Sequence, residues 1–212
     1  MFVADWMTRQ VVTVAPTESV LHAMHLMRDR GIKHLPVLKD GRLVGVISDR
    51  DIKAYCPSKA TSLDVYEINY LLSKAAVHEA MASRLVTIEP GAPVEQAAML
   101  MLDGNIGCLP VLEGEALAGI ISDRDIFRAL VDISGVRHGG HRICVVIADR
   151  PGTVKEVADI IRRHGFHLRG IMTSYEGVPE GSRRAVIRTT RTGAFEALRA
   201  DLEAAYGSVA IS

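Results

Sequence analysis

The sequence predicts an α+β protein of three small parts: two copies of a β-α-β-β-α unit and one β-α-β-β-α-β domain. The first observation is an internal repeat. Residues 3–52 align without a gap on residues 77–126, and 23 of the 50 pairs are identical. Such self-similarity at a fixed shift indicates a duplicated structural unit. The second observation is the Gly-Gly pair at residues 139–140, after which a different order of elements begins.

The composition fits a folded, cytoplasmic protein. Of 212 residues, 48% are apolar and 24% charged, with 25 basic and 25 acidic residues, so no binding to nucleic acid or an anionic membrane is expected. The apolar runs are far shorter than the roughly 20 residues of a membrane span. The first ten residues lack the pattern of a secretory signal. Three separated cysteines form no C-x-x-C pair, which argues against a disulfide framework and a zinc site.

Within each copy the elements follow the same order. In copy one, a β segment at Val11–Val14 is followed by a helix with apolar residues at helical spacing over 20–27. Strands at Leu35–Leu38 and Leu43–Ile47 flank a tight turn, and a second helix begins near Asp49. One such unit is too small to bury a stable core alone. We therefore expect the copies to pack about a pseudo-twofold axis that creates two equivalent clefts.

This duplicated unit resembles a tandem pair of cystathionine-β-synthase (CBS) domains. The resemblance rests on Leu-Pro-Val at Leu35 and Leu109, and on Gly-x-Ile-Ser-x-x-Asp from Gly45 and Gly119. It covers residues 3 to about 135 and implies repeats at 1–58 and 77–135 with a helical linker at 59–76. It also implies a sensor, without catalytic residues, that binds AMP, ADP, ATP or S-adenosylmethionine as a regulatory ligand in the clefts.

The strand-to-helix junction from Ser48 to Asp51 carries groups that an adenosine phosphate needs. The Ser48 hydroxyl and helix N–H groups can hold phosphate, Arg50 can neutralise it, and Asp51 can accept both ribose hydroxyls. Copy two repeats the arrangement. The family resemblance also implies that the residues around each Pro-Val sequence and a threonine in the first strand of each copy contact the ligand. The candidate nucleotide-binding residues are Thr13, Lys33, His34, Pro36, Ser48, Arg50, Asp51, Thr87, Cys108, Pro110, Ser122, Arg124 and Asp125.

The copies differ where phosphate would lie. Lys33 and His34 of copy one are basic and hydrogen-bonding, whereas Gly107 and Cys108 of copy two are neither. We therefore predict that the cleft built on Asp51 binds the more highly charged nucleotide, or binds nucleotide more tightly.

A ligand-free role for the same motif stays open. Ser-x-x-Asp at a helix start is also a capping-box pattern, which stabilises a helix by about 1 kcal/mol without any ligand. The two roles conflict, because an Asp51 engaged as a cap must release its N–H partner to grip a ribose.

The linker is expected to form a helix over Asp64–Leu72 with a cap at Thr61. Its apolar stripe, which includes Ile68 and Leu71, either packs on the CBS pair or contacts a second subunit.

Residues 136–141 are predicted to form a polar linker, and residues 142–212 have the order of the split βαβ, or ferredoxin-like, fold. The predicted elements are strands at Arg142–Ala148, His167–Ser174, Ala185–Thr190 and Ser208–Ile211, a helix from Thr153 and a helix over Ala194–Tyr206.

The first of these strands, followed by Asp-Arg-Pro-Gly and a helix, resembles an ACT domain, a regulatory module that typically binds amino acids. The resemblance implies an effector site at the turn, where Asp149 and Gly152 are the matching positions. A CBS pair followed by an ACT domain resembles the acetoin-utilisation regulatory proteins of the AcuB type. That likeness rests on the architecture and on the linker insert between the two repeats.

The expected function is therefore a regulatory adenine-nucleotide sensor with a metabolite-binding ACT domain. No Ser–His–Asp, Cys–His or paired-carboxylate arrangement has a motif context, so no catalytic residue is assigned. His138 and His141 have no further ligands around them, so no metal is assigned. The expected partners are a second copy of the chain and an unknown regulated protein. The alternatives are a ligand-independent dimeric scaffold that regulates a partner enzyme and, third, an enzyme.

Overall fold

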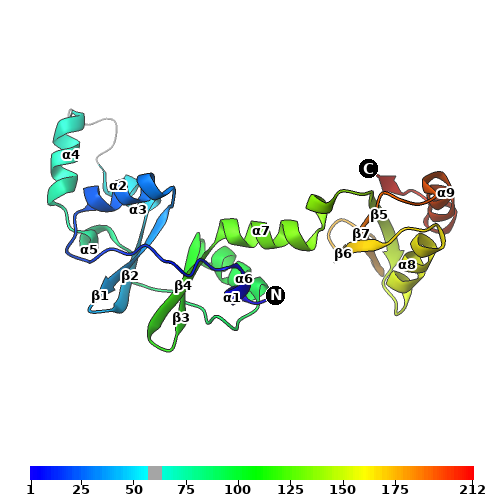
Figure 1. The fold of residues 1–212 in the computed structure, drawn as a ribbon, viewed down its shortest axis with the longest axis horizontal. Coiled ribbons are helices and arrows are strands. Elements are labelled where there is room, and N and C mark those ends of the chain that lie inside the picture. The colour runs from blue at the N-terminus through cyan, green and yellow to red at the C-terminus, as the bar shows by residue number, and fades with distance from the viewer. Residues whose placement is uncertain (57–63) are drawn as a thin grey trace. The chain divides into compact units, whose positions relative to one another are not determined.

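The computed structural model describes residues 1–56 and 64–212, which form two compact units, Met1–Ile126 and Phe127–Ser212 (Figure 1). The first unit holds both copies of the repeat up to the start of the last helix. The linker helix α4 (Val65–Lys74) begins at Asp64, whose carboxylate accepts the Glu67 N–H at 2.8 Å. The cap predicted at Thr61 lies outside the described residues.

Both copies contain the predicted helices and strand pairs in the predicted order. Copy one consists of α2 (Val20–Arg30), β1 (His34–Lys39), β2 (Arg42–Ser48) and α3 (Asp49–Tyr55). Copy two consists of α6 (Val94–Gly104), β3 (Cys108–Glu113), β4 (Ala116–Ser122) and α7 (Asp123–Ile133). The short helices α1 (Val3–Trp6) and α5 (Val77–Ala80) precede them.

The opening strands of the copies are shorter than the sequence predicts. Val14 and Ile88 form only isolated parallel bridges, to Val37 and Val111 respectively. The strand pairs themselves are antiparallel. In copy one they are joined through Asp40 and Gly41, whose φ angles of 51° and 78° suit the twist of a two-residue hairpin.

The short segment that opens each copy packs in the core of the other copy. Residues of α1 pack with the strands of copy two, and residues of α5 pack with the strands of copy one. Isolated antiparallel bridges fasten the same segments, from Thr8 to Ile120 and from Ala82 to Val46. The predicted boundaries at 1–58 and 77–135 therefore follow the sequence repeat, whereas the packing exchanges short segments between the copies.

This exchange explains the glycine in each Gly-x-Ile-Ser motif. A Cβ atom on Gly119 would lie 2.9 Å from the Thr8 carbonyl oxygen and 2.7 Å from the Met7 sulfur. A Cβ atom on Gly45 would meet the Met81 sulfur in the same way. Both positions need a residue without a side chain because the exchanged segment crosses directly over them.

The second unit has the β-α-β-β-α-β order that the sequence predicts. Its elements are β5 (Arg142–Ala148), α8 (Thr153–Arg163), β6 (Leu168–Ser174), β7 (Ser182–Thr189), α9 (Phe195–Tyr206) and β8 (Ala210–Ile211), after a 3₁₀ turn, η1 (Val136–His138). The strands form one antiparallel sheet in the order β6-β7-β5-β8. This arrangement is compatible with the predicted ferredoxin-like fold.

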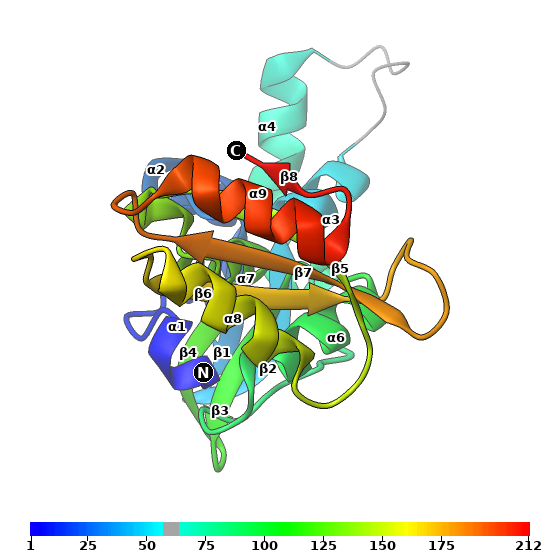
Figure 2. The same ribbon diagram turned by 90° about the vertical axis from the view of Figure 1, so that its right-hand side faces the viewer.

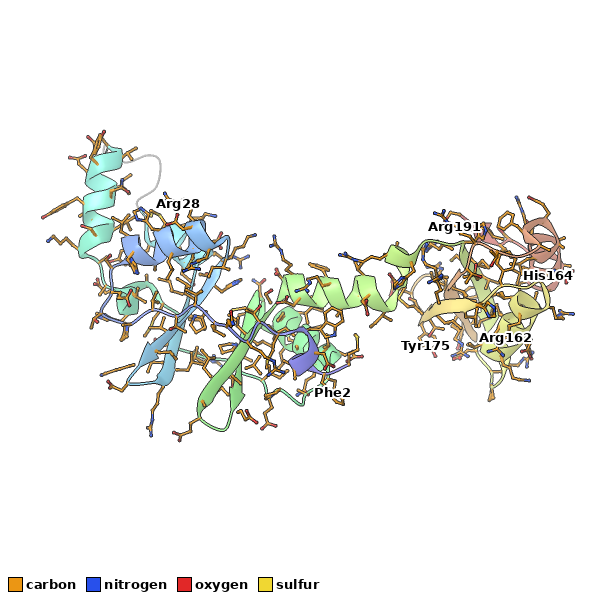
Figure 3. All side chains as sticks on the ribbon, viewed as in Figure 1. Phe2, Arg28, Arg162, His164, Tyr175 and Arg191 are labelled. Atoms are coloured by element: carbon orange, nitrogen blue, oxygen red, sulfur yellow. The ribbon has the colours of Figure 1, made fainter. Side chains whose placement is uncertain are left out.

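Helices α8 and α9 cover one face of this sheet (Figure 2). Alternate residues of β5 and β7, such as Ile143 and Ile187, are fully buried beneath them. His164, labelled in Figure 3, comes just after α8. Its ring Nε2 lies 2.9 Å from an Asp201 carboxylate oxygen on α9, and this contact ties the two helices together. Among the described residues, no helix combines the length and apolar character needed to cross a membrane.

Candidate functional site

One cavity of the first unit lies between elements of the two copies. Its volume of about 520 Å³ falls within the range of roughly 300–1,000 Å³ that is usual for small-molecule sites. Copy one contributes the junction Ser48–Asp51, and copy two contributes residues before and within β3 and the start of α7. Seven predicted residues line it: Lys33, His34, Ser48, Arg50, Asp51, Cys108 and Pro110.

Asp51 lines this pocket while it serves as a helix cap. Its Oδ2 atom accepts the Ser48 backbone N–H at 2.8 Å and the Ser48 hydroxyl at 2.5 Å. The Asp51 N–H in turn donates to the Ser48 oxygen at 3.2 Å. The predicted capping box is therefore present, and a ribose would compete with Ser48 for the same carboxylate oxygen.

Several of the basic side chains that line the pocket are not neutralised by an ion pair with a described carboxylate. Lys53 forms an ion pair with Asp49 at 3.0 Å. Burial works to raise the pKa of Asp49, but the Lys53 hydrogen bond and the nearby Lys33 charge outweigh it and lower that pKa below 3.8. Within the described part of the chain, the side chains of Lys33, Arg50 and Arg84 form no ion pair. Such cations are suited to a phosphate group.

His34 of copy one and Cys108 of copy two both line the pocket. A Cβ atom on Gly107, which precedes Cys108, would lie 3.0 Å from the His34 Nε2 atom. Burial lowers the pKa of His34 below 6.5, although Asp123, Asp49 and Asp51 oppose the shift. Burial raises the pKa of Cys108 to about 12, with Asp123 and Asp51 adding to the effect. The histidine is therefore held largely neutral and the thiol fully protonated near pH 7.

The structure corrects the expectation of separate phosphate regions. Lys33-His34 and Gly107-Cys108 were assigned to different clefts, but both line this one pocket. They meet because each pair precedes a strand, β1 or β3, at the junction of the two copies. The remaining predicted nucleotide-binding residues do not line this pocket: Thr13, Pro36, Thr87, Ser122, Arg124 and Asp125.

The two copies are therefore not equivalent at their acidic residues. Asp125 is only 7% exposed, and it accepts the Ser122 N–H at 2.9 Å and the Ser122 hydroxyl at 2.7 Å. It repeats the cap of Asp51, but it lies outside the cavity that Asp51 lines. The expectation of a second, equivalent cleft on the Asp125 side stays a prediction.

Arg84 is a pocket residue that the sequence interpretation missed. It precedes the opening segment of copy two, and the equivalent residue 74 positions earlier is Gln10. The sequence did contain a clue, because the aligned positions differ in charge: Arg84 is basic and Gln10 is neutral. Arg84 is followed by Leu85 and Val86, which also line the pocket. It strengthens the predicted bias of the Asp51 pocket toward anionic ligands.

The predicted effector turn of the second unit lies between β5 and α8. Asp149 and Gly152 are both exposed, and the Asp149 carboxylate lies 3.6 Å from the Arg183 Nε atom. That Nε atom is buried without a hydrogen-bond partner, while another Arg183 nitrogen donates to Thr153 at 3.3 Å. Among the described residues, no group of three or more His, Cys, Asp or Glu side chains is placed to hold a metal ion.

The duplicated unit with a cavity between its copies has the architecture of a CBS-domain pair, and the chain belongs to the CBS domain family. The family model matches residues 3–58 and 77–132 and does not extend into the second unit. Of two curated relatives, the chain spans 66% of the length of an archaeal protein and 81% of a Bacillus subtilis protein.

Several solved structures are similar to part of the chain. A Vibrio cholerae protein named for acetoin utilization (AcuB) is 29% identical with a TM-score of 0.54, covering 65% of this chain and 96% of that one. The CBS pair of protein MJ0100, in complex with 5′-methylthioadenosine and S-adenosyl-L-methionine, is 25% identical with a TM-score of 0.51, covering 61% and 95%. CBSX2 in complex with AMP is 29% identical with a TM-score of 0.51, covering 62% and 97%.

Proposed function

We propose that the protein is a regulatory sensor whose Asp51 pocket binds an adenosyl ligand. The observation that carries the proposal is one cavity that holds the Asp51 carboxylate, which can accept ribose hydroxyls, and three cations that form no ion pair with any described residue. The related CBS pairs in complex with AMP and S-adenosylmethionine support it. An adenine nucleotide with at least one phosphate satisfies these cations, so AMP, ADP or ATP fits the pocket better than a neutral adenosyl compound.

Each side chain has a distinct role in this proposal. Asp51 accepts the ribose hydroxyls after it gives up its bonds to Ser48, and the freed Ser48 hydroxyl turns toward phosphate. Lys33 and Arg84 neutralise the phosphate from opposite copies of the repeat. The ligand thus bridges the two copies, and binding stabilises one packing of the pair over others.

Isothermal titration with AMP, ATP and S-adenosylmethionine tests the proposal, and the repeat supplies a matched control. Asp51→Ala and Asp125→Ala each remove an equivalent helix cap, so both lose about 1 kcal/mol of stability. Only Asp51→Ala is expected to weaken AMP binding, by tenfold or more. Loss of binding in Asp125→Ala alone, or no binding of any of the three ligands to the unmodified chain, would contradict the proposal.

For the second unit we propose an ACT-like effector site at the turn from Asp149 to Gly152. The Asp149 carboxylate suits an ammonium group, and the unsatisfied Arg183 Nε suits a carboxylate, so an amino acid matches both. A thermal-shift screen of the twenty amino acids tests the site. The expected stabilisation by one of them is lost in Asp149→Asn, and an unchanged shift in that variant would rule the turn out.

We further propose an AcuB-like regulatory role, in which the protein acts as a homodimer on another protein and carries out no turnover itself. Nucleotide and effector should then alter each other's affinity by the same factor.

The alternative to a sensor is a ligand-independent scaffold. It is favoured by α4, where Val65, Tyr66 and Tyr70 are 71%, 84% and 63% exposed. A scaffold would bind none of the adenosyl ligands yet lose its self-association in Tyr66→Ser, which sedimentation would detect.

A further inference from the structure

The face of the second unit's sheet opposite α8 and α9 carries a pocket of its own. Its volume is about 330 Å³, and the side chains that line it from β5, β6 and β7 all belong to the face that the two helices leave uncovered. The other wall is the last part of α7 and the turn after it, from Leu130 to Val136. In the chain, α7 leads through this turn directly into β5 (Figure 1).

The close approach of α7 to the sheet depends on Gly170 of β6. A Cβ atom at this position would lie 2.8 Å from the Ile133 carbonyl oxygen and 3.4 Å from Ser134. The glycine therefore lets the end of the helix rest on the strand, so that the pocket is walled on two sides.

The floor of the pocket holds two arginines side by side. Arg142 of β5 lies directly opposite Arg188 of β7 in the sheet register, and both are half-buried. Like charges directly opposite each other on neighbouring strands are unfavourable. None of the described residues that line the pocket is acidic, and neither arginine forms an ion pair with a described carboxylate.

The rest of the lining is apolar. Leu130, Val131 and Val136 face Met172 and Val186, and Ser134 is the only other polar side chain among the described lining residues. An occupant must therefore present a negative group to two guanidinium groups and an aliphatic body to this wall. The cavity is smaller than the Asp51 pocket, which favours a compact molecule over a nucleotide.

We propose that this pocket binds a small organic anion, a carboxylate on a short aliphatic chain, with Arg142 and Arg188 sharing the carboxylate. The planar guanidinium groups can each donate two hydrogen bonds to such a group, and the bound charge removes the repulsion between them. The site is distinct from the effector turn proposed above. Arg142 is the first residue of β5, whereas Asp149 follows its last residue at the opposite end of the strand.

Titration of the full chain with hexanoate tests the site, with hexan-1-ol, hexylammonium and inorganic phosphate as comparison ligands. Saturable hexanoate binding is expected, at least tenfold tighter than that of the alcohol and the amine. Arg188→Gln should weaken it by tenfold or more. The matched control is Arg162→Gln on α8, on the covered side of the sheet (Figure 3), which should leave it unchanged. The Met172 methyl NMR signal should shift on binding and report its location.

Folding controls keep the result decisive. Because Arg188→Gln relieves a like-charge contact, its ligand-free melting temperature should equal or exceed that of the unmodified chain. Val186→Asp, which places a negative charge in the pocket, should also prevent binding. The proposal is overturned if hexanoate does not bind, if hexan-1-ol binds equally well, if phosphate alone binds as tightly as hexanoate, or if Arg188→Gln destabilises the unit by several degrees, which would make the arginines structural.

Discussion

His34 links the protonation of one buried side chain to the stability of the first unit. Its pKa lies below 6.5 in the folded state because burial disfavours the charged ring. The unfolded chain therefore binds this proton at a higher pH than the folded chain does. Above pH 6.5 the contribution of His34 to the free energy of unfolding is at its maximum. It decreases as the pH falls from 6.5 toward the pKa of the folded state.

Urea unfolding at a series of pH values from about 5.5 to 7.5 measures this contribution. The unmodified chain should lose stability as the pH falls across this window, and His34→Gln should lose less. A steeper loss in His34→Gln would mean that the ring is stabilised by protonation and that its pKa is raised.

Cys108 should be the least reactive of the three cysteines. Its pKa of about 12 leaves almost no thiolate near pH 8, and the residue is buried, whereas Cys56 and Cys144 are half-buried. Iodoacetamide labelling followed by mass spectrometry should modify Cys108 last, and AMP should slow it further if the ligand covers the pocket. Labelling of Cys108 as fast as Cys56 would show that burial does not hold its pKa high.

At the level of elements, the glycines of the Gly-x-Ile-Ser motif are expected to be structural. Gly119→Ala places a methyl group against the Thr8 carbonyl oxygen, so it should lower the free energy of unfolding by about 1–3 kcal/mol. Gly91→Ala is the matched control, since a Cβ atom there would meet nothing within 4 Å. Chemical denaturation measures the free energy of unfolding of both variants. Equal values would show that the segment crossing Gly119 moves aside without loss of stability.

The exchange of segments also shows where sequence reasoning stops. The helices, the hairpins and the Ser48 and Ser122 caps were predictable, because each is encoded by local periodicity or spacing that the repeat shows twice. The packing of α1 with copy two and of α5 with copy one leaves no local signal, since it depends on contacts between residues far apart in the chain. For the same reason, the sequence interpretation assigned Lys33-His34 and Gly107-Cys108 to two different clefts, whereas both pairs line one pocket.

At the scale of the whole chain, the two units have separate hydrophobic cores. Calorimetry should therefore resolve two unfolding transitions. AMP at 100 times its dissociation constant should stabilise the first unit by about 2.7 kcal/mol. An AMP-dependent shift confined to the transition of the second unit would place the nucleotide site outside the CBS pair.

The location of a bound nucleotide tests the central claim most directly. A crystal structure of the full chain grown with AMP should show the ribose hydroxyls on the Asp51 carboxylate and the phosphate beside Lys33 and Arg84. Asp125 should keep its bonds to Ser122 in the same crystal. AMP bound on the Asp125 side, with Asp51 still capping α3 through Ser48, would contradict this account.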